Sequence, residues 1–240
     1  MSIPLEAGFA GERNRIQRSS CFVIPIMSKK SIVQRSPYLP LTGSTILIAG
    51  GAGFIGSNFI RHLKKTQPRL RIVNFDKLTY AAYRPPTPLL QVRGGQGGEI
   101  VRGDIANKKQ VEAIFKKYKP NYLVNFAAET HVDRSIHGDA GVFVRTNVQG
   151  VFTLLEACRK FGIKRYVQVS TDEVYGDVEV YSKKTFTEDS VLRPSSPYSS
   201  TKAAGDLLCM SYHRSFGVPV VVTRGSNTYG PYQFPEKIIP

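Results

Sequence analysis

The sequence has little that suits a membrane, a disulfide framework or a metal centre. The apolar run from Cys21 to Met27 is short and is broken by Pro25. No run approaches the roughly 20 residues that cross a bilayer. Its three cysteines, Cys21, Cys158 and Cys209, form no CxxC pair and have no histidine at metal-ligand spacing. We therefore expect no secretion signal, no membrane segment and no metal, and we expect reduced thiols in a cytoplasmic protein.

Acidic residues are also few, since 18 Asp and Glu stand against 33 Lys and Arg and the formal net charge is +15. A positive surface can bind nucleic acid through its phosphates, or it can attract substrates and cofactors that are diphosphates. The excess charge is mostly scattered along the chain, and no nucleic-acid-binding motif accompanies it. We favour a basic enzyme with diphosphate ligands and expect no nucleic-acid partner.

Residues 1–43 lack the periodicity of a helix or a strand and contain four prolines. We interpret them as a flexible N-terminal extension. A transit peptide is an alternative, although two acids and the lack of an amphipathic pattern weaken it. Another alternative is that translation starts at Met27. Residues 44–240 are expected to hold the folded domain.

From residue 45 on, apolar stretches of strand length alternate with stretches of helical length. The predicted strands are 45–50, 71–76, 100–101, 121–129, 165–170 and 218–224, and the predicted helices are 54–65, 107–118, 147–161 and 198–216. Residues 81–98 are rich in Pro and Gly where another helix is expected, and we predict a loop there. The alternation predicts an α/β fold, a Rossmann-type doubly wound parallel sheet with helices on both faces.

A glycine pattern, Gly50-Gly-Ala-Gly53-Phe-Ile-Gly56, joins the first predicted strand to the first predicted helix. A tight turn needs one glycine, close approach to a pyrophosphate needs a second, and packing of the helix on the strand needs a third. Asp76 ends the next strand, where a carboxylate suits ribose hydroxyls and repels a 2′-phosphate. The pattern predicts dinucleotide binding and favours NAD over NADP, with Lys77 as a residue that argues weakly the other way.

Tyr198 and Lys202 lie four residues apart in a predicted helix and so share one helix face. The pKa of a free tyrosine is about 10, and a nearby ammonium or an oxidised nicotinamide favours the phenolate. We therefore predict that Lys202 lowers the pKa of Tyr198, which acts as a base, and holds the cofactor ribose. The alternative is a surface tyrosine beside a solvated lysine.

Thr171, Asp172 and Glu173 follow the predicted strand 165–170, at the strand end where open α/β sheets bind ligands. A hydroxyl there can bind a sugar. Two neighbouring carboxyl groups suit an elimination, because one protonates the leaving hydroxyl while the other removes a proton. Two adjacent charges also resist joint ionisation, which keeps one group protonated. A polar turn without chemistry is the alternative.

The spacing of the glycines resembles the extended short-chain dehydrogenase/reductase family. Asp104-Ile105 and FAAET (126–130) resemble segments that lie beside the cofactor in that family, although Asp104 could simply cap the next helix and Ala127–Ala128 could be small for packing. Four further segments resemble the nucleotide-sugar 4,6-dehydratases within it, in particular those acting on dTDP-glucose. These segments are HVDRSI (131–136), STDEVYG (170–176), YSSTKAA (198–204) and TRGSNTYGPYQFPEKIIP (223–240).

The resemblance implies contacts to NAD from a set of residues spread over the predicted sheet edge. The set is Gly50, Gly53, Phe54, Ile55, Gly56, Asp76, Lys77, Leu78, Thr79, Asp104, Ile105, Phe126, Ala127, Ala128, Thr130, Thr146, Tyr198 and Lys202. It implies contacts to the nucleotide sugar from Thr130, Thr171 and Asn227, and catalysis by Thr171, Asp172, Glu173, Tyr198 and Lys202. No metal is implied.

The implied reaction is that of a lyase in deoxysugar biosynthesis. Tyr198 takes the C4 hydroxyl proton while hydride passes to NAD, Glu173 removes the C5 proton, Asp172 protonates the departing C6 hydroxyl, and the hydride returns to C6. Helices 139–161 and 197–217 resemble those that pair across a homodimer in this family. Packing of their apolar faces in the core of one chain would explain the pattern equally well.

Two departures from the family pattern stand out. Residues 81–98 lack the helix that relatives carry, and Thr228 replaces a second asparagine. The chain also stops where relatives continue, so we expect an incomplete substrate lobe. The alternatives are an epimerase or decarboxylase of UDP-sugars in the same family, and a non-catalytic module that binds NAD. Thymidine is the expected base, with uridine next.

Overall fold

The computed structural model describes residues 41–82, 99–178 and 185–233, all of which belong to one compact unit, Pro37–Pro240. Nearly all of the predicted N-terminal extension and of the predicted loop 81–98 lies outside the described residues. Both therefore stay predictions.

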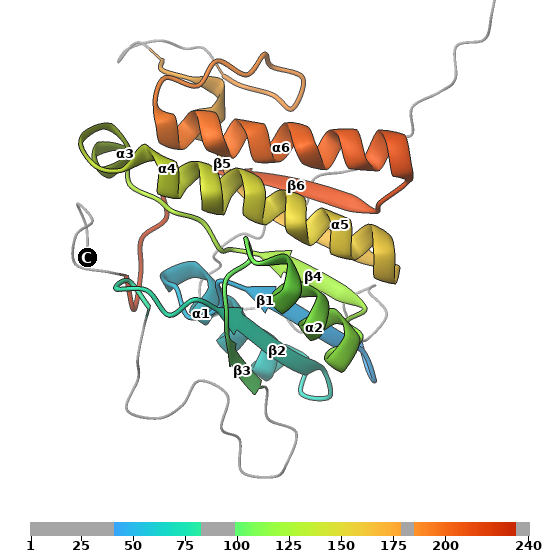
Figure 1. Cartoon of the computed structure of the whole chain (residues 1–240). Helices are drawn as coiled ribbons and strands as arrows, with labels where there is room; N and C mark the ends of the chain where they lie inside the picture. The colour runs from blue at the N-terminus through green and yellow to red at the C-terminus, as the bar shows by residue number, and fades with distance from the viewer. Residues whose placement is uncertain (1–40, 83–98, 179–184, 234–240) are drawn as a thin grey trace, which may run out of the picture. The chain divides into compact units, whose positions relative to one another are not determined.

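Six parallel strands form one sheet, as the alternating pattern predicts (Figure 1). The strands are β1 (Thr45–Ala49), β2 (Arg71–Asp76), β3 (Glu99–Arg102), β4 (Tyr122–Asn125), β5 (Arg165–Thr171) and β6 (Val220–Gly225). Their order is β3-β2-β1-β4-β5-β6, and every neighbouring pair runs parallel. The order reverses between β1 and β4, and ligands of open α/β sheets bind in the crevice at such a point.

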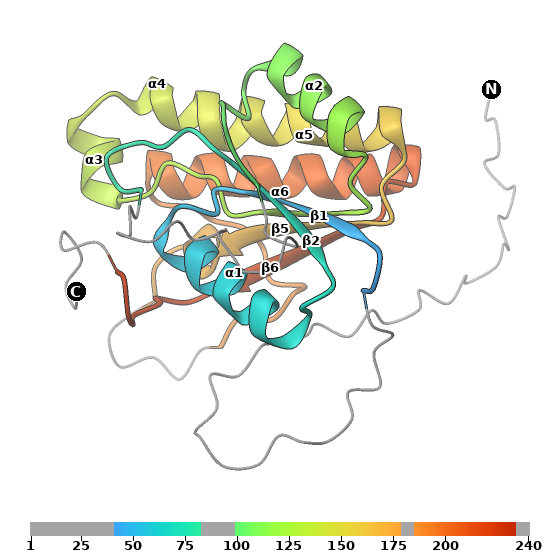
Figure 2. The same ribbon diagram turned by 90° about the horizontal axis from the view of Figure 1, so that it is seen from below.

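Helices cover both faces of the sheet, so the predicted fold class is confirmed. Helix α1 (Phe54–Thr66) lies on one face, and α2 (Lys108–Tyr118), α5 (Val151–Phe161) and α6 (Pro197–Phe216) lie on the other (Figure 2). The alternation of side chains along β1 explains both layers. Ile46 and Ile48 pack with α1, whereas Leu47 and Ala49 belong to the core beneath α2, α5 and α6.

The predicted strand 121–129 is too long, because β4 ends at Asn125. Phe126 still donates its backbone N–H to Ala49 O at 2.8 Å. The side chain of Asn125 then accepts the Ala127 N–H at 3.1 Å, and this local turn takes the chain out of the sheet. Residues 126–130 therefore lie beyond the strand, at its carboxyl end.

The predicted helix 147–161 begins earlier than its apolar spacing indicates. It follows α3 (Val132–His137), which was not predicted, and α4 (Ala140–Phe143), whose cap Asp139 accepts the Gly141 N–H at 2.7 Å. A π-helix, Val144–Gly150, then leads into α5. One extra residue per turn shifts the helical periodicity, so the sequence pattern alone does not reveal this segment.

Helix α6 begins at Pro197, one residue before the predicted start at Tyr198. Ser196 and Ser199 bond reciprocally in a capping box, and Pro197 occupies the first turn, where its missing N–H is no loss. Gly217 ends the helix with φ +68°. The strong N-terminal signal sets where Tyr198 lies relative to the sheet edge.

Candidate active site

The glycine turn lies at the carboxyl end of β1, and three of its glycines leave no room for a Cβ. At Gly51 a Cβ would lie 2.5 Å from Asn74 Oδ1. Gly50 has φ +75°, and a Cβ there would lie 2.4 Å from the Ala127 backbone nitrogen. A Cβ at Gly56 would lie 2.4 Å from Gly50 O, so this glycine lets α1 pack against the turn. At Gly53 a Cβ would meet only Gly50 O, at 3.4 Å. A Cβ at Gly53 would therefore make only an ordinary van der Waals contact.

Asp76 supports the turn as well as ending β2. Its Oδ2 accepts the Ala52 N–H and its Oδ1 accepts the Leu78 N–H, both at 2.8 Å. Burial raises the pKa of Asp76, and these two N–H groups oppose the rise. Asn74, which was not predicted, accepts the Gly51 N–H at 3.0 Å. A polar residue inside a buried strand was the available signal for Asn74.

Asp104 lies at the end of β3 between two cations. Lys77 lies 3.3 Å and Arg145 3.1 Å from its Oδ2. Burial alone would raise the pKa of Asp104, but the Ala106 N–H and the two charges outweigh it and hold the pKa below its usual value. Asp104 does not cap α2, because Asn107 is the N-cap and accepts the Gln110 N–H.

The other predicted cofactor residues differ in burial. Ile105 is 4% exposed and packs in the core beneath Gly150, where a Cβ would lie 2.5 Å from Ile105 Cδ1. Phe126 packs on Phe59 with 5.3 Å between ring centroids. Phe54, Leu78, Ala127, Ala128 and Thr146 are partly buried, whereas Ile55, Thr79 and Thr130 are exposed.

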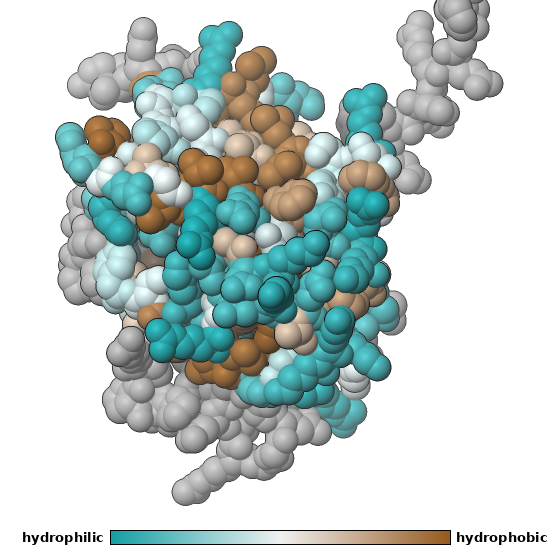
Figure 3. All heavy atoms as spheres, viewed as in Figure 1, coloured by the Kyte–Doolittle hydropathy of each residue, from teal (hydrophilic) through white to brown (hydrophobic). Residues whose placement is uncertain are grey.

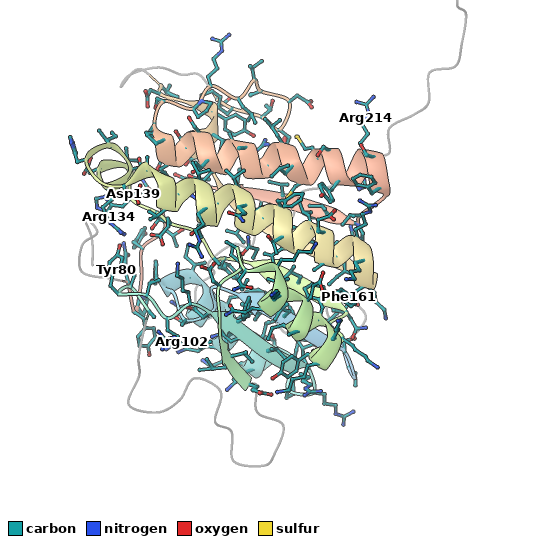
Figure 4. The ribbon with its side chains drawn as sticks, viewed as in Figure 1. Tyr80, Arg102, Arg134, Asp139, Phe161 and Arg214 are labelled. Carbon is teal, nitrogen blue, oxygen red and sulfur yellow. The ribbon has the colours of Figure 1, made fainter. Side chains whose placement is uncertain are left out.

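Arg134 ties the segment after β2 to the segment after β4 (Figure 4). Its guanidinium lies 4.6 Å from the Tyr80 ring centroid and donates to the Tyr80 hydroxyl. It also lies 3.8 Å from the carboxylate of Glu129. None of these residues was predicted as a site residue, and the isolated sequence offers no spacing that pairs them.

The predicted catalytic residues of β5 and α6 come together. Thr171 ends β5 and its hydroxyl accepts the Glu173 N–H at 3.3 Å, at the start of a 3₁₀ turn, Asp172–Tyr175. Tyr198 is 9% exposed. Burial raises its pKa to about 12, the Glu173 charge adds to the rise, the Thr171 hydroxyl opposes it and Asp172 adds further. Two acids, a hydroxyl and a phenol thus share one site.

Lys202 does not act on Tyr198 as predicted. Its ammonium donates to the Val169 carbonyl at 2.7 Å, and the charges that act on Tyr198 come from the two acids. The predicted lowering of the Tyr198 pKa is therefore wrong for this arrangement, since the pKa is raised. Burial lowers the pKa of Lys202 itself to about 8.

Asn147 in the π-helix is a buried polar residue that sequence reasoning missed. Its Oδ1 accepts the Glu129 N–H at 2.9 Å, and its Nδ2 donates to Glu129 O and to Thr201 Oγ1, each at 3.0 Å. It links the end of β4 to α6 one residue before Lys202. Asn227, by contrast, lies in the exposed segment after β6, at the same edge of the sheet.

In the described ranges, no helix is long and apolar enough to cross a membrane. Within the same residues, no group of three or more His, Cys, Asp or Glu is arranged to hold a metal ion.

Comparisons with known proteins agree with the geometry. A family model described as GDP-mannose 4,6 dehydratase matches residues 47–240. The dTDP-glucose 4,6-dehydratase of Xanthomonas campestris pv. campestris (strain B100) is 44% identical over 206 residues, and that of Streptomyces griseus is 49% identical over 197. The matches cover 82% and 81% of this chain, and the chain spans 57% of each relative.

Solved structures include a dTDP-glucose 4,6-dehydratase from Bacillus anthracis str. Ames in complex with NAD, with TM-score 0.71 and 42% identity. A UDP-glucose 4-epimerase from Thermus thermophilus in complex with NAD has TM-score 0.70 and 32% identity. The matches cover 81% and 80% of this chain and 58% of each neighbour.

Proposed function

Because the chain belongs to the GDP-mannose 4,6-dehydratase family, we propose that it forms the cofactor-binding and catalytic part of an NAD-dependent 4,6-dehydratase of dTDP-glucose. The observation that carries the proposal is the meeting of Asp172 and Glu173 with Tyr198 at the end of β5. A tyrosine base serves an oxidation at C4, and only an elimination needs two further carboxyl groups. Residues 44–240 are the domain that performs both.

The residues at the glycine turn fit a dinucleotide. Gly50 and Gly56 bring backbone against backbone, while Gly53 leaves room for a pyrophosphate at the N-terminus of α1. The first turn of a helix offers N–H groups without partners in the helix, and its dipole favours an anion. The Asp76 carboxylate accepts one N–H at each oxygen and keeps further lone pairs for ribose hydroxyls.

A side chain of this protein serves each proton transfer of the reaction. Tyr198 accepts the proton of the C4 hydroxyl, and Thr171 binds that hydroxyl. NAD, held by the glycine turn and Asp76, would supply the hydride acceptor for C4 and the hydride donor for C6. The C4 keto group acidifies C5, Glu173 removes the C5 proton, and Asp172 protonates the C6 hydroxyl, which leaves as water. As the hydride reaches C6, the protonated Glu173 gives its proton back to C5.

Tyr198 needs help to ionise, because its pKa of about 12 lies far above neutral pH. A positive charge close to the phenol favours its ionised form. The oxidised nicotinamide is the source of that charge. Lys202 supplies a donor for the nicotinamide ribose.

The test uses the full chain with NAD and dTDP-glucose and follows the nucleotide sugar by mass spectrometry. Loss of one water is expected, and Glu173→Gln should slow it at least ~100-fold, since a general base contributes about that much. Asp189→Asn removes an exposed acid and serves as the matched control. Calorimetry with NAD reports cofactor binding separately.

Other outcomes would point to the rival functions. Isomerisation without a change of mass would indicate an epimerase, and loss of carbon dioxide from a UDP-uronic acid would indicate a decarboxylase. NAD binding with an unchanged substrate would indicate a non-catalytic module. Faster turnover of UDP-glucose than of dTDP-glucose would show that the substrate carries uracil rather than thymine.

The protein also forms a homodimer through α5 and α6. Apolar side chains gather on this face (Figure 3), and Phe152, Leu207 and Met210 are 45%, 56% and 47% exposed. An exposed apolar patch of this kind is typical of an interface, and a two-fold axis lets one face pack against its own copy. Light scattering should give a dimer. Leu207→Lys should disrupt it, whereas Val191→Lys, at an exposed site outside these helices, should not.

The buried free thiols Cys158 and Cys209 suit a reducing, cytoplasmic location.

A further inference from the structure

Arg224 joins β6 to two segments that carry predicted site residues, α6 and the 3₁₀ turn Asp172–Tyr175. From β6 it donates Nε to Asp206 Oδ2 on α6 and Nη1 to the Tyr175 hydroxyl in the 3₁₀ turn, each at 2.8 Å. Its side chain is 11% exposed and that of Asp206 is fully buried. Its guanidinium also lies 5.1 Å from the Tyr175 ring centroid. This ion pair is therefore enclosed, and its geometry is held by a third partner.

The pair lies one helical turn beyond Lys202. Residues four apart in a helix are neighbours on one face, so the Asp206 carboxylate follows the Lys202 ammonium along α6. Lys202 is 6% exposed, and its ammonium donates to a neutral acceptor, the Val169 carbonyl. A buried ammonium without a counter-charge is costly. Asp206 is the acid whose charge acts on Lys202.

We propose that Asp206, held and kept ionised by Arg224, is a positioning residue that keeps the buried Lys202 ammonium charged. Lys202 then enters the reaction as the donor to the ribose. This role of Lys202 rests on the proposed function, whereas its coupling to Asp206 does not. Tyr198, the base in the proposed function, and Asp206, which acts through Lys202, lie about two turns apart on α6.

The charges around Lys202 support this order of effects. Burial lowers the pKa of Lys202 to about 8, while Asp206 and then Cys209, both on its own helix, oppose the fall. Burial raises the pKa of Asp206, while Arg224 from β6, Ser170 from β5 and Lys202 itself oppose the rise. Tyr175 from the 3₁₀ turn bonds Arg224 and so completes the set. Arg224 keeps Asp206 ionised, and Asp206 keeps Lys202 ionised.

The first experiment follows the titration of Lys202 by NMR of the full chain with ¹³C-labelled lysine, and Lys202→Met assigns the signal. Asp206→Asn should move the Lys202 midpoint down by about one pH unit, since an opposite charge within a few ångströms shifts a pKa by about that much or more. Asp189→Asn removes an equal charge from the exposed surface and should leave the midpoint in place. An unchanged midpoint in Asp206→Asn overturns the proposal.

A reciprocal measurement covers the case in which Asp206→Asn does not fold. Coupling is mutual, so removing the lysine charge in Lys202→Met should raise the Asp206 midpoint, read from ¹³C-labelled aspartate. An equal Asp206 midpoint in Lys202→Met and in the unmodified chain contradicts the proposal. Calorimetry with NAD on the same samples keeps the two ideas apart. Failure of the unmodified chain to bind NAD refutes the proposed function, while the titrations still decide the coupling.

Discussion

Gly50→Ala is expected to destabilise the fold through two separate effects. Gly50 has φ +75°, and an L-residue in this left-handed region costs about 1 kcal/mol or somewhat more. In addition, the new Cβ would lie 2.4 Å from the Ala127 nitrogen and 2.6 Å from its Cα. These are backbone atoms, which have no rotamer to change. Overpacking of this kind costs a further ~1–3 kcal/mol, so the total is about 2–4 kcal/mol.

Gly162→Ala separates the two effects. Gly162 follows α5 with φ +71°, and a Cβ there meets nothing within 4 Å. This variant should lose only the conformational part, about 1 kcal/mol. The difference between the two variants therefore measures how closely the glycine turn approaches the segment after β4.

The assay is equilibrium unfolding in urea, which gives the free energy of unfolding of each variant. Gly50→Ala should be less stable than Gly162→Ala by at least about 1 kcal/mol, with the same dependence on urea. Equal losses would refute the reasoning, because they would mean that Ala127 recedes without cost. The site would then tolerate movement between β1 and β4, which the proposed cofactor contacts do not allow.

Two further predictions concern buried polar groups. Asn147→Ala should lower the free energy of unfolding by about 2–3 kcal/mol, because it leaves the Glu129 backbone without its partners, whereas Gln149→Ala on the exposed side of the π-helix should change it by less than about 0.5 kcal/mol. Equal losses by thermal or urea unfolding would contradict this. Tyr198 contributes stability below its unfolded pKa of about 10, and since its pKa in the fold is raised to about 12, that contribution is lost as pH rises from about 10 to 12. Relative to Tyr198→Phe, the native chain should lose about 2–3 kcal/mol across this window, and parallel stability curves would show that the phenol is not buried as described.

Local signals in the sequence were sufficient to predict an element boundary where the residue there has a direct structural role. Asn107 starts α2 because its side chain accepts a backbone N–H group. The strand 71–76 was predicted to the residue, since its apolar run is bounded on both sides. The glycine turn and the Tyr198–Lys202 pair likewise have spacings with a direct geometric meaning.

The same local reasoning failed where a contact between distant segments decides the outcome. The predicted strand 121–129 was too long, because a side-chain bond from Asn125 ends β4 early. The pKa of Tyr198 was expected to be lowered, because spacing alone does not show that Lys202 bonds Val169 while two acids approach the phenol. Burial and charge of a group depend on every element packed around it.

The sequence by itself therefore determined the fold class, the cap at Asn107 and the position of the glycine turn. These features depend on residues that are adjacent or one turn apart, where chain geometry fixes their distance. Only the tertiary structure decided the partners of Asn147, Arg134, Asp206 and Arg224. Each of these residues joins segments that lie 5 to 54 residues apart in the chain, and the parallel order of the strands alone brings such segments together.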